Sequence, residues 1–150
     1  MFFLIEIKSD IRQECPFIKY QEDIIIPLLK KYAMLDRCAF VSLNHQMLLR
    51  LKKKYPECKI SMLYLYDHGL DVVDYTLKHG FDIFTLRNNE LTKENVEKIH
   101  SLNLEVSTWP QNNEKMIRNC LDWAIDYLVT DDIKTAMLVK KEWQKERGEV

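Results

Sequence analysis

Two residues of opposite charge stand at the end of the first apolar segment of this sequence. Glu6 and Lys8 lie two positions apart, after an apolar run from Phe2 to Ile5. Because successive strand residues point to opposite faces, the two charged side chains share one face and leave Ile5 and Ile7 on the other. A carboxylate can hold a hard divalent cation, and an ammonium beside it can contact a phosphate. An exposed surface ion pair has the same spacing, so the pair alone does not distinguish a site from a surface.

Polar residues also follow the next strand that the sequence predicts. Ser42 and Asn44 stand two positions apart at its end, so they share a face and could line a pocket. Asn44 is equally suited to cap the helix that follows, because its side-chain oxygen can accept from free backbone N–H groups there. The four histidines follow a strand, lie in a loop or stand near helix ends, where surface histidines are expected. No residue is therefore assigned a catalytic role.

Six segments have the composition and length of β-strands. They are Phe3–Ile7, Cys38–Leu43, Lys59–Tyr66, Asp82–Leu86, Glu105–Trp109 and Tyr127–Thr130. From the second onward they recur at the spacing of one strand-plus-helix unit. Repeated units of this kind predict a parallel sheet with helices outside it, either open or closed into a barrel. A closed barrel of this class has eight strands.

Helical patterns with readable ends fill the segments between the strands. The predicted N-caps are Asn44, Thr92 and either Asp131 or Asp132, and Gly80 is the predicted C-cap glycine. Pro27 lies inside an apolar pattern from Ile24 to Tyr32, where it should start the helix late or kink it. No domain boundary is visible, so residues 1–150 are expected to form one domain.

The composition is that of an ordinary globular chain, with 47% hydrophobic and 30% charged residues. The net charge is −1 and the basic residues are scattered, which argues against a nucleic-acid partner because such a surface needs a basic stripe. The four cysteines form no CxxC pair, which favours reduced thiols over a zinc site. No window approaches the ~20 apolar residues of a membrane span. These features predict a cytoplasmic protein with no membrane span.

Four motifs in order carry a resemblance to a known family. They are Glu6-Ile7-Lys8-Ser9, Ser42-Leu43-Asn44-His45, Trp109-Pro110-Gln111-Asn112 and Ile125-Asp126-Tyr127-Leu128-Val129-Thr130-Asp131. The chain resembles the C-terminal part of a glycerophosphodiester phosphodiesterase, whose members read E-I-K-S, S-F-N-H, W-T-V-N and G-V-D-G-I-I-T-D at similar spacing. The resemblance implies an α/β fold, a partial TIM-type (β/α) barrel of about six parallel strands with outer helices. It also implies hydrolysis of glycerophosphodiesters to glycerol 3-phosphate and an alcohol, in lipid metabolism.

The resemblance assigns roles to five positions of this sequence. It implies that Glu6 is a ligand of a divalent cation, Mg²⁺ or Ca²⁺, and that Lys8 contacts the scissile phosphate. Trp109 would form an aromatic wall for the glycerol moiety, although a buried core tryptophan is an equal alternative. Ser42 and Asn44 would line the substrate pocket.

The sequence also departs from the family's pattern. In the family, an H-R-G motif, a Glu-x-Asp metal pair and a second histidine precede E-I-K, and this sequence contains none of them there. The expectation is therefore a barrel without its N-terminal strands, weak cation binding, and a chain that is inactive or incomplete on its own. The alternative is a non-catalytic binding or interaction protein on a remnant barrel scaffold. Unpaired sheet edges would then favour self-association or binding of a complementing N-terminal fragment.

Overall fold

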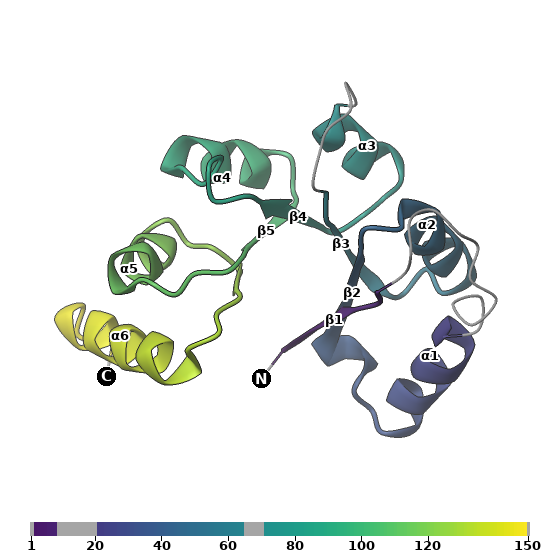
Figure 1. Cartoon of the computed structure of the whole chain (residues 1–150), viewed down its shortest axis with the longest axis horizontal. Coiled ribbons are helices and arrows are strands. Elements are labelled where there is room, and N and C mark those ends of the chain that lie inside the picture. Colours follow the sequence, from purple (N-terminus) through teal and green to yellow (C-terminus); the bar gives the residue numbers. More distant parts are fainter. Residues whose placement is uncertain (1, 9–20, 65–70, 150) are drawn as a thin grey trace. The chain divides into compact units, whose positions relative to one another are not determined.

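The computed structural model of the chain describes residues 2–8, 21–64 and 71–149. In these residues strands and helices alternate, and six strands form a sheet whose order follows the sequence from β1 to β6 (Figure 1). The pairings of β1 with β2, β2 with β3, β3 with β4 and β5 with β6 are all parallel. The fold is α/β, a partial TIM-type (β/α) barrel with surrounding helices, as the sequence predicted. The chain divides into two compact units, Met1–Phe84 and Thr85–Val150.

The first unit contains the first three strands and the start of the fourth. Its elements are β1 (Phe3–Glu6), α1 (Gln21–Lys31), the short 3₁₀ helix η2 (Leu35–Arg37), β2 (Cys38–Ser42), α2 (His45–Lys54), β3 (Lys59–Met62), α3 (Val72–Lys78) and the beginning of β4 (Ile83–Leu86). Every residue of β2 is buried, because this strand pairs on both sides and lies under helices. β1 is only partly buried, and Phe3 is 36% exposed.

The second unit contains the remaining strands and helices. Its elements after β4 are α4 (Lys93–Ser101), β5 (Glu105–Thr108), α5 (Glu114–Asp122), β6 (Tyr127–Leu128) and α6 (Ile133–Glu146). Val96, Ile99, Val106, Ile117 and Cys120 form its buried interior. β6 is shorter than the predicted segment of residues 127–130. Hydrogen bonding nevertheless continues past its end, because the Val129 N–H donates to the Thr108 carbonyl over 3.0 Å.

The predicted helix ends are largely confirmed. The side chains of Asn44, Thr92 and Asp132 accept from backbone N–H groups in the first turns of α2, α4 and α6. Gly80 follows α3 with a φ of 63°, which its missing Cβ allows at little cost. Of the two effects predicted for Pro27, the late start is wrong, since α1 begins at Gln21 and includes this proline, whereas the kink stays a prediction.

One polar arrangement that was not predicted from the sequence occurs twice, once in each unit. Asp82 precedes β4, and its Oδ2 accepts from the Ile60 N–H and the Lys52 ammonium, both over 2.8 Å. Asp126 precedes β6, and its Oδ2 accepts from the Val106 N–H over 2.8 Å and from His100 Nε2 over 2.9 Å. Each carboxylate thus ties the start of the preceding strand to a basic residue of the helix before it.

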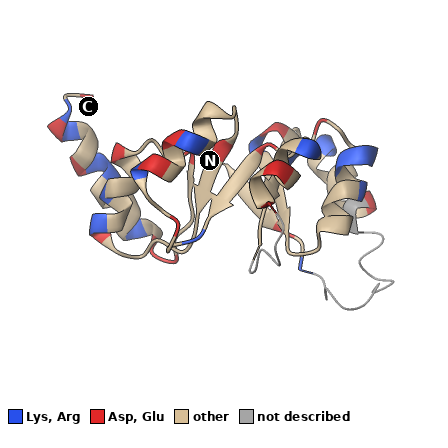
Figure 2. Cartoon of the chain, turned by 90° about the horizontal axis from the view of Figure 1, so that it is seen from above, with Lys and Arg blue, Asp and Glu red and all other residues tan. Residues whose placement is uncertain are grey.

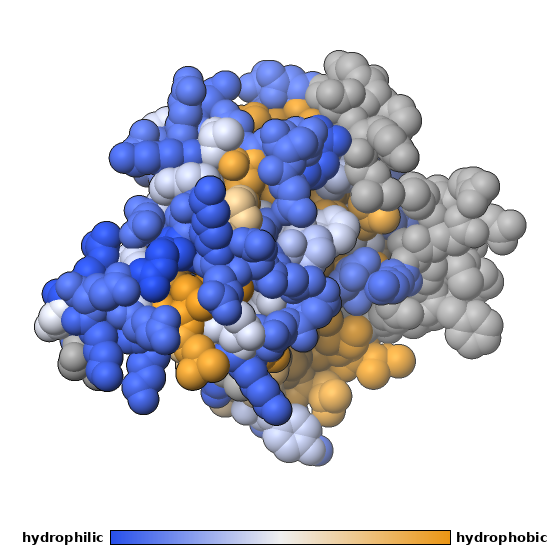
Figure 3. All heavy atoms as spheres, turned by 60° about the vertical axis from the view of Figure 1, so that its left-hand side comes forward, coloured by the Kyte–Doolittle hydropathy of each residue, from blue (hydrophilic) through white to orange (hydrophobic). Residues whose placement is uncertain are grey.

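The surface carries mixed charge and separate apolar patches. Lys and Arg alternate with Asp and Glu along the helices (Figure 2). Hydrophobic atoms reach the surface between hydrophilic side chains (Figure 3). Among the helices of the described residues, none combines the length and hydrophobicity needed to cross a bilayer.

Candidate functional site

The ends of β1 and β2 bring the first predicted pair into position. Glu6 aligns with Val41 in the parallel pairing of the two strands. The next N–H, that of Ile7, donates to the Val41 carbonyl over 2.9 Å, so the chain follows β2 for one further residue. Parallel pairing of this strand with its neighbour is thus confirmed. In barrel enzymes of this class, active-site residues lie at this carboxyl end of the strands.

Glu6 and Lys8 form an open ion pair. The Lys8 Nζ lies 3.7 Å from the Glu6 Oε2, and the two side chains are 84% and 42% exposed. Ile7, between them, is only 2% exposed, as expected for a residue that points to the opposite, helix-covered face. This distance is longer than that of a good charge-assisted hydrogen bond, so the carboxylate and the ammonium are both able to contact a charged ligand.

Ser42 locks the end of β1 against β2. It is fully buried, and its hydroxyl donates to the Ile7 carbonyl over 2.6 Å. The same oxygen accepts from the Asn44 N–H over 3.1 Å. The Asn44 side chain in turn accepts from the Met47 N–H over 3.1 Å, which is the helix cap that the sequence offered as its alternative role. Substrate contacts by Ser42 and Asn44 stay predictions.

His45 is a strand-end residue that the sequence analysis left among surface histidines. Its Nε2 lies 2.8 Å from the Leu63 carbonyl oxygen. Because a carbonyl can only accept, Nε2 is the donor of this hydrogen bond. The ring also lies 5.6 Å from that of Tyr75, measured between centroids. The sequence did contain a sign of this placement, because His45 directly follows the Asn44 cap. A residue at such a strand–helix junction is held at the carboxyl end of the sheet.

In the second unit, Trp109 follows β5 on a segment that is fixed on both sides. Gln111 is 3% exposed, and its Nε2 donates to Asn88 Oδ1 over 2.5 Å and to Thr108 Oγ1 over 3.1 Å. Asn112 Oδ1 accepts from the Asp131 N–H over 2.9 Å. Trp109 itself is 39% exposed, so it is not a buried core tryptophan, and its contact with glycerol stays a prediction.

Four of the five predicted site residues lie together. Glu6, Lys8, Ser42 and Asn44 stand at the ends of two adjacent strands of the first unit, whereas Trp109 belongs to the second. Among the described residues, no group of three or more His, Cys, Asp or Glu side chains is placed for a metal. Glu6 offers one carboxylate where such ions take about six or more oxygens, and the Lys8 ammonium competes for it.

Comparison with known proteins identifies one family. The model of the Glycerophosphoryl diester phosphodiesterase family matches residues 4–135. A search among curated proteins gave no match.

Solved structures share the fold at low sequence identity. A candidate glycerophosphoryl diester phosphodiesterase of Silicibacter pomeroyi has a TM-score of 0.79 and 21% identity, over 94% of this chain and 50% of its own. A candidate glycerophosphodiester phosphodiesterase of Galdieria sulphuraria has a TM-score of 0.75 and 24% identity, over 93% and 57%. A phosphodiesterase of Oleispira antarctica in complex with the product sn-glycerol-3-phosphate has a TM-score of 0.64 and 12% identity, over 82% and 51%. The chain thus spans about half the length of these proteins.

Proposed function

Because this chain belongs to the glycerophosphoryl diester phosphodiesterase family, we propose that it carries part of a site that hydrolyses glycerophosphodiesters to glycerol 3-phosphate and an alcohol. The observation that supports this most is the exposed pair of Glu6 and Lys8 at the carboxyl end of β1. The solved phosphodiesterase with bound sn-glycerol-3-phosphate supports the substrate class. Residues 1–150 form one partial domain of the family in this proposal.

Lys8 is the phosphate-binding group of the proposed site. Its ammonium is largely exposed and held by a strand end that Ser42 fixes, so it can meet phosphoryl oxygens without rearrangement of the backbone. A positive charge at that place stabilises the charge that spreads over those oxygens in the transition state. Trp109 is the proposed wall for the glycerol moiety.

Glu6 is the proposed cation ligand, and we expect weak binding of Mg²⁺ or Ca²⁺ by this chain alone. A single carboxylate beside an ammonium supplies too few oxygens for either ion. No residue of this sequence is assigned as an acid–base group of the reaction, because none of its four histidines stands at a position that the family uses for catalysis. Each such group contributes about 10²- to 10⁴-fold in rate. The isolated chain should therefore bind product without turning over substrate.

Two measurements test this proposal. We expect glycerol 3-phosphate to bind the isolated chain in a titration followed by NMR, and Lys8→Gln to weaken binding by about tenfold, the loss of one charge-assisted contact. Lys53→Gln, an exposed lysine on α2, is the matched control and should bind as the unmodified chain does. Equal binding by the two variants would contradict the role of Lys8.

The second measurement concerns turnover. With glycerophosphocholine and Mg²⁺ or Ca²⁺, we expect the unmodified chain to release no more glycerol 3-phosphate than Glu6→Gln does. Release well above that variant would show that the chain is active alone, with His45 the first residue to test as the acid–base group.

A second candidate function is that of a non-catalytic interaction protein. It is supported by an apolar face formed by Ile24 and Leu28 of α1 and by Tyr32 directly after the helix, which are 67%, 51% and 62% exposed and spaced four residues apart. Such a face, together with the partly exposed β1, would bind a second copy or a complementing fragment.

We propose a cytoplasmic location for either function. Cys38, Cys58 and Cys120 are free and buried, as is usual for proteins of reducing compartments. Burial raises the pKa of Cys58 and of Cys120 to about 11, so these thiols are neutral packing groups at physiological pH.

A further inference from the structure

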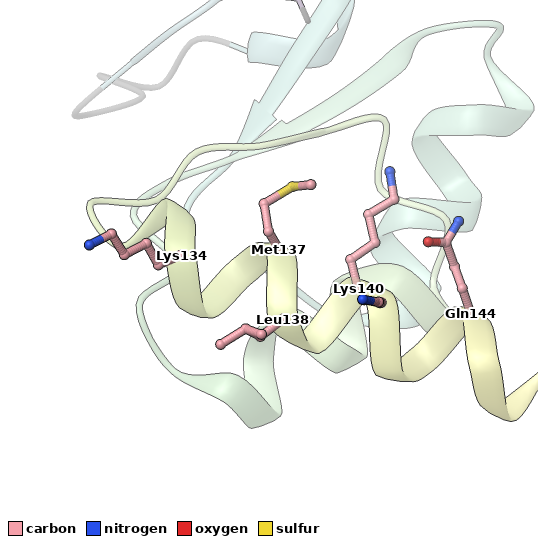
Figure 4. A pocket seen from close by; sticks show the side chains of 6 residues that line it. Lys134, Met137, Leu138, Lys140 and Gln144 are labelled. Atoms are coloured by element: carbon pink, nitrogen blue, oxygen red, sulfur yellow. The ribbon is translucent and has the colours of Figure 1, made fainter. Parts of the chain in front are cut away.

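The last helix presents a second apolar face, of different character from that of α1. On α6, Ile133, Met137 and Leu138 are 69%, 60% and 62% exposed. At about 100° per residue, Met137 lies about 40° and Leu138 about 140° around the helix from Ile133, so the three fall within one half of its circumference. They lie beside a shallow hollow of about 710 Å³ lined by Lys134, Met137, Leu138, Lys140, Lys141 and Gln144 (Figure 4). We call the residues on this side, Ile133, Lys134, Met137, Leu138, Lys140, Lys141, Gln144 and Lys145, the outward face of α6.

The opposite side of α6 packs against α5 and carries both acidic residues of the helix. Val139 is 5% exposed, and Trp143 Nε1 donates to Asp122 Oδ1 at the end of α5 over 2.8 Å. Arg118 of α5 pairs with Glu146 over 2.6 Å and with Glu142 over 4.0 Å. Both glutamates of α6 are therefore directed to α5 and away from the outward face.

The outward face therefore has a net positive charge that no acidic residue on the same face balances. Four lysines lie on it and no acidic residue does. Within the described parts of the chain, no carboxylate forms an ion pair with Lys134, Lys140, Lys141 or Lys145. Blue Lys and Arg segments recur along the helix that ends near the C-terminus (Figure 2). A ligand of negative charge with an apolar layer beneath it would complement this face.

We propose that the outward face of α6 binds an anionic lipid surface. The apolar side chains would enter the boundary between headgroups and acyl chains, and the lysines would extend to the anionic headgroups. The face contains no Trp, Tyr or Arg, the residues that most often anchor protein–protein contacts. This inference is independent of phosphodiester hydrolysis, so the failure of one leaves the other standing.

Sedimentation with vesicles tests the proposal on the full chain. We expect binding to vesicles of phosphatidylcholine with phosphatidylserine, and none to vesicles of phosphatidylcholine alone. Lys140→Glu with Lys141→Glu should reduce the bound-to-free ratio by about tenfold or more, because each lysine near an anionic surface contributes about 1 kcal/mol. Salt at about 1 M should reduce binding as well, since it screens charges beyond about 3 Å.

A matched control separates the face from overall charge. Lys93→Glu with Lys98→Glu on α4 makes the same change in net charge at exposed positions and should leave vesicle binding unchanged. Circular dichroism would establish that both variants are folded. Equal binding to both kinds of vesicle, no binding, or equal loss in the two variants would overturn the proposal. Binding of polyglutamate by the α6 face without binding of vesicles would also overturn it, in favour of an acidic protein partner.

Discussion

At the scale of single residues, a buried hydroxyl decides where the exposed charges stand. Lys8 is 84% exposed, and its Nζ lies 3.7 Å from the Glu6 Oε2. Its backbone is fixed one residue earlier, where the Ile7 carbonyl accepts from the Ser42 hydroxyl over 2.6 Å. Ser42 therefore acts as a positioning residue, and the direct contact with phosphate is left to Lys8.

Substitution of Ser42 should show this role. In Ser42→Ala, the Ile7 carbonyl loses its buried donor and the Asn44 N–H loses its acceptor. We expect the free energy of unfolding to fall by about 1–3 kcal/mol, the cost of leaving buried polar groups unsatisfied. Urea denaturation measures it. Ser101→Ala is the control, because Ser101 is exposed on α4 and bonds only within its own helix, and it should change stability by less than about 0.5 kcal/mol.

At the scale of elements, strands and helices are joined by the two carboxylates Asp82 and Asp126. Each accepts both a backbone N–H of the preceding strand and a basic side chain of the preceding helix. They lie at the amino-terminal side of the sheet, away from the strand ends that carry Glu6 and Trp109. In barrels, this side contributes to stability and the opposite side to chemistry.

A double-mutant cycle on Asp82 measures how much one such junction contributes. Asp82→Ala leaves the Ile60 N–H without its side-chain acceptor and the Lys52 ammonium with the Cys58 carbonyl, at 3.1 Å, as its remaining acceptor. We expect it to cost about 2–4 kcal/mol in unfolding free energy. Lys52→Met added to Asp82→Ala should cost less than the sum of the two single changes, because they share one interaction. Asp74→Ala, at an exposed position on α3, is the control. Additive costs at Asp82 and Lys52 would show that the pair is not coupled.

At the scale of the whole molecule, the chain has about half the length of the proteins whose fold it shares. Its first strand is only partly buried, and Ile24, Leu28 and Tyr32 form the exposed apolar face along and directly after α1. Apolar area of this kind gains about 25 cal/mol per Å² when it is covered. A partner that covers this face would thus stabilise the chain.

We expect the purified chain to self-associate through this face of α1. Sedimentation at several concentrations should show an increasing mass, and Leu28→Lys should shift the equilibrium toward monomer. Lys31→Glu, an exposed change at the end of the same helix that leaves Ile24, Leu28 and Tyr32 intact, serves as the control. A monomer at all concentrations with a cooperative thermal transition would contradict the expectation.

The sequence alone determined those features that depend on neighbours along the chain. Alternation of apolar runs and helical patterns predicted the order of six parallel strands and their helices, because both periods are local. The caps Asn44 and Thr92 followed from the preference of short polar side chains for helix starts. Strand alternation predicted that Glu6 and Lys8 share one face. The 3.7 Å between their charged groups agrees with that prediction, as does the parallel pairing of β1 with β2.

Only the tertiary structure decided which polar groups form hydrogen bonds or ion pairs within the protein. Ser42 and Asn44 looked alike as pocket residues, yet Ser42 bonds a carbonyl 35 positions away. Asp82 bonds Lys52, which lies 30 positions earlier in the chain. The two glutamates of α6 pair with Arg118 of α5, so no acidic residue balances the lysines of the outward face. These pairings depend on how the elements pack against one another, and a pattern read along one segment carries no information about the charge or donor that a distant segment brings to it.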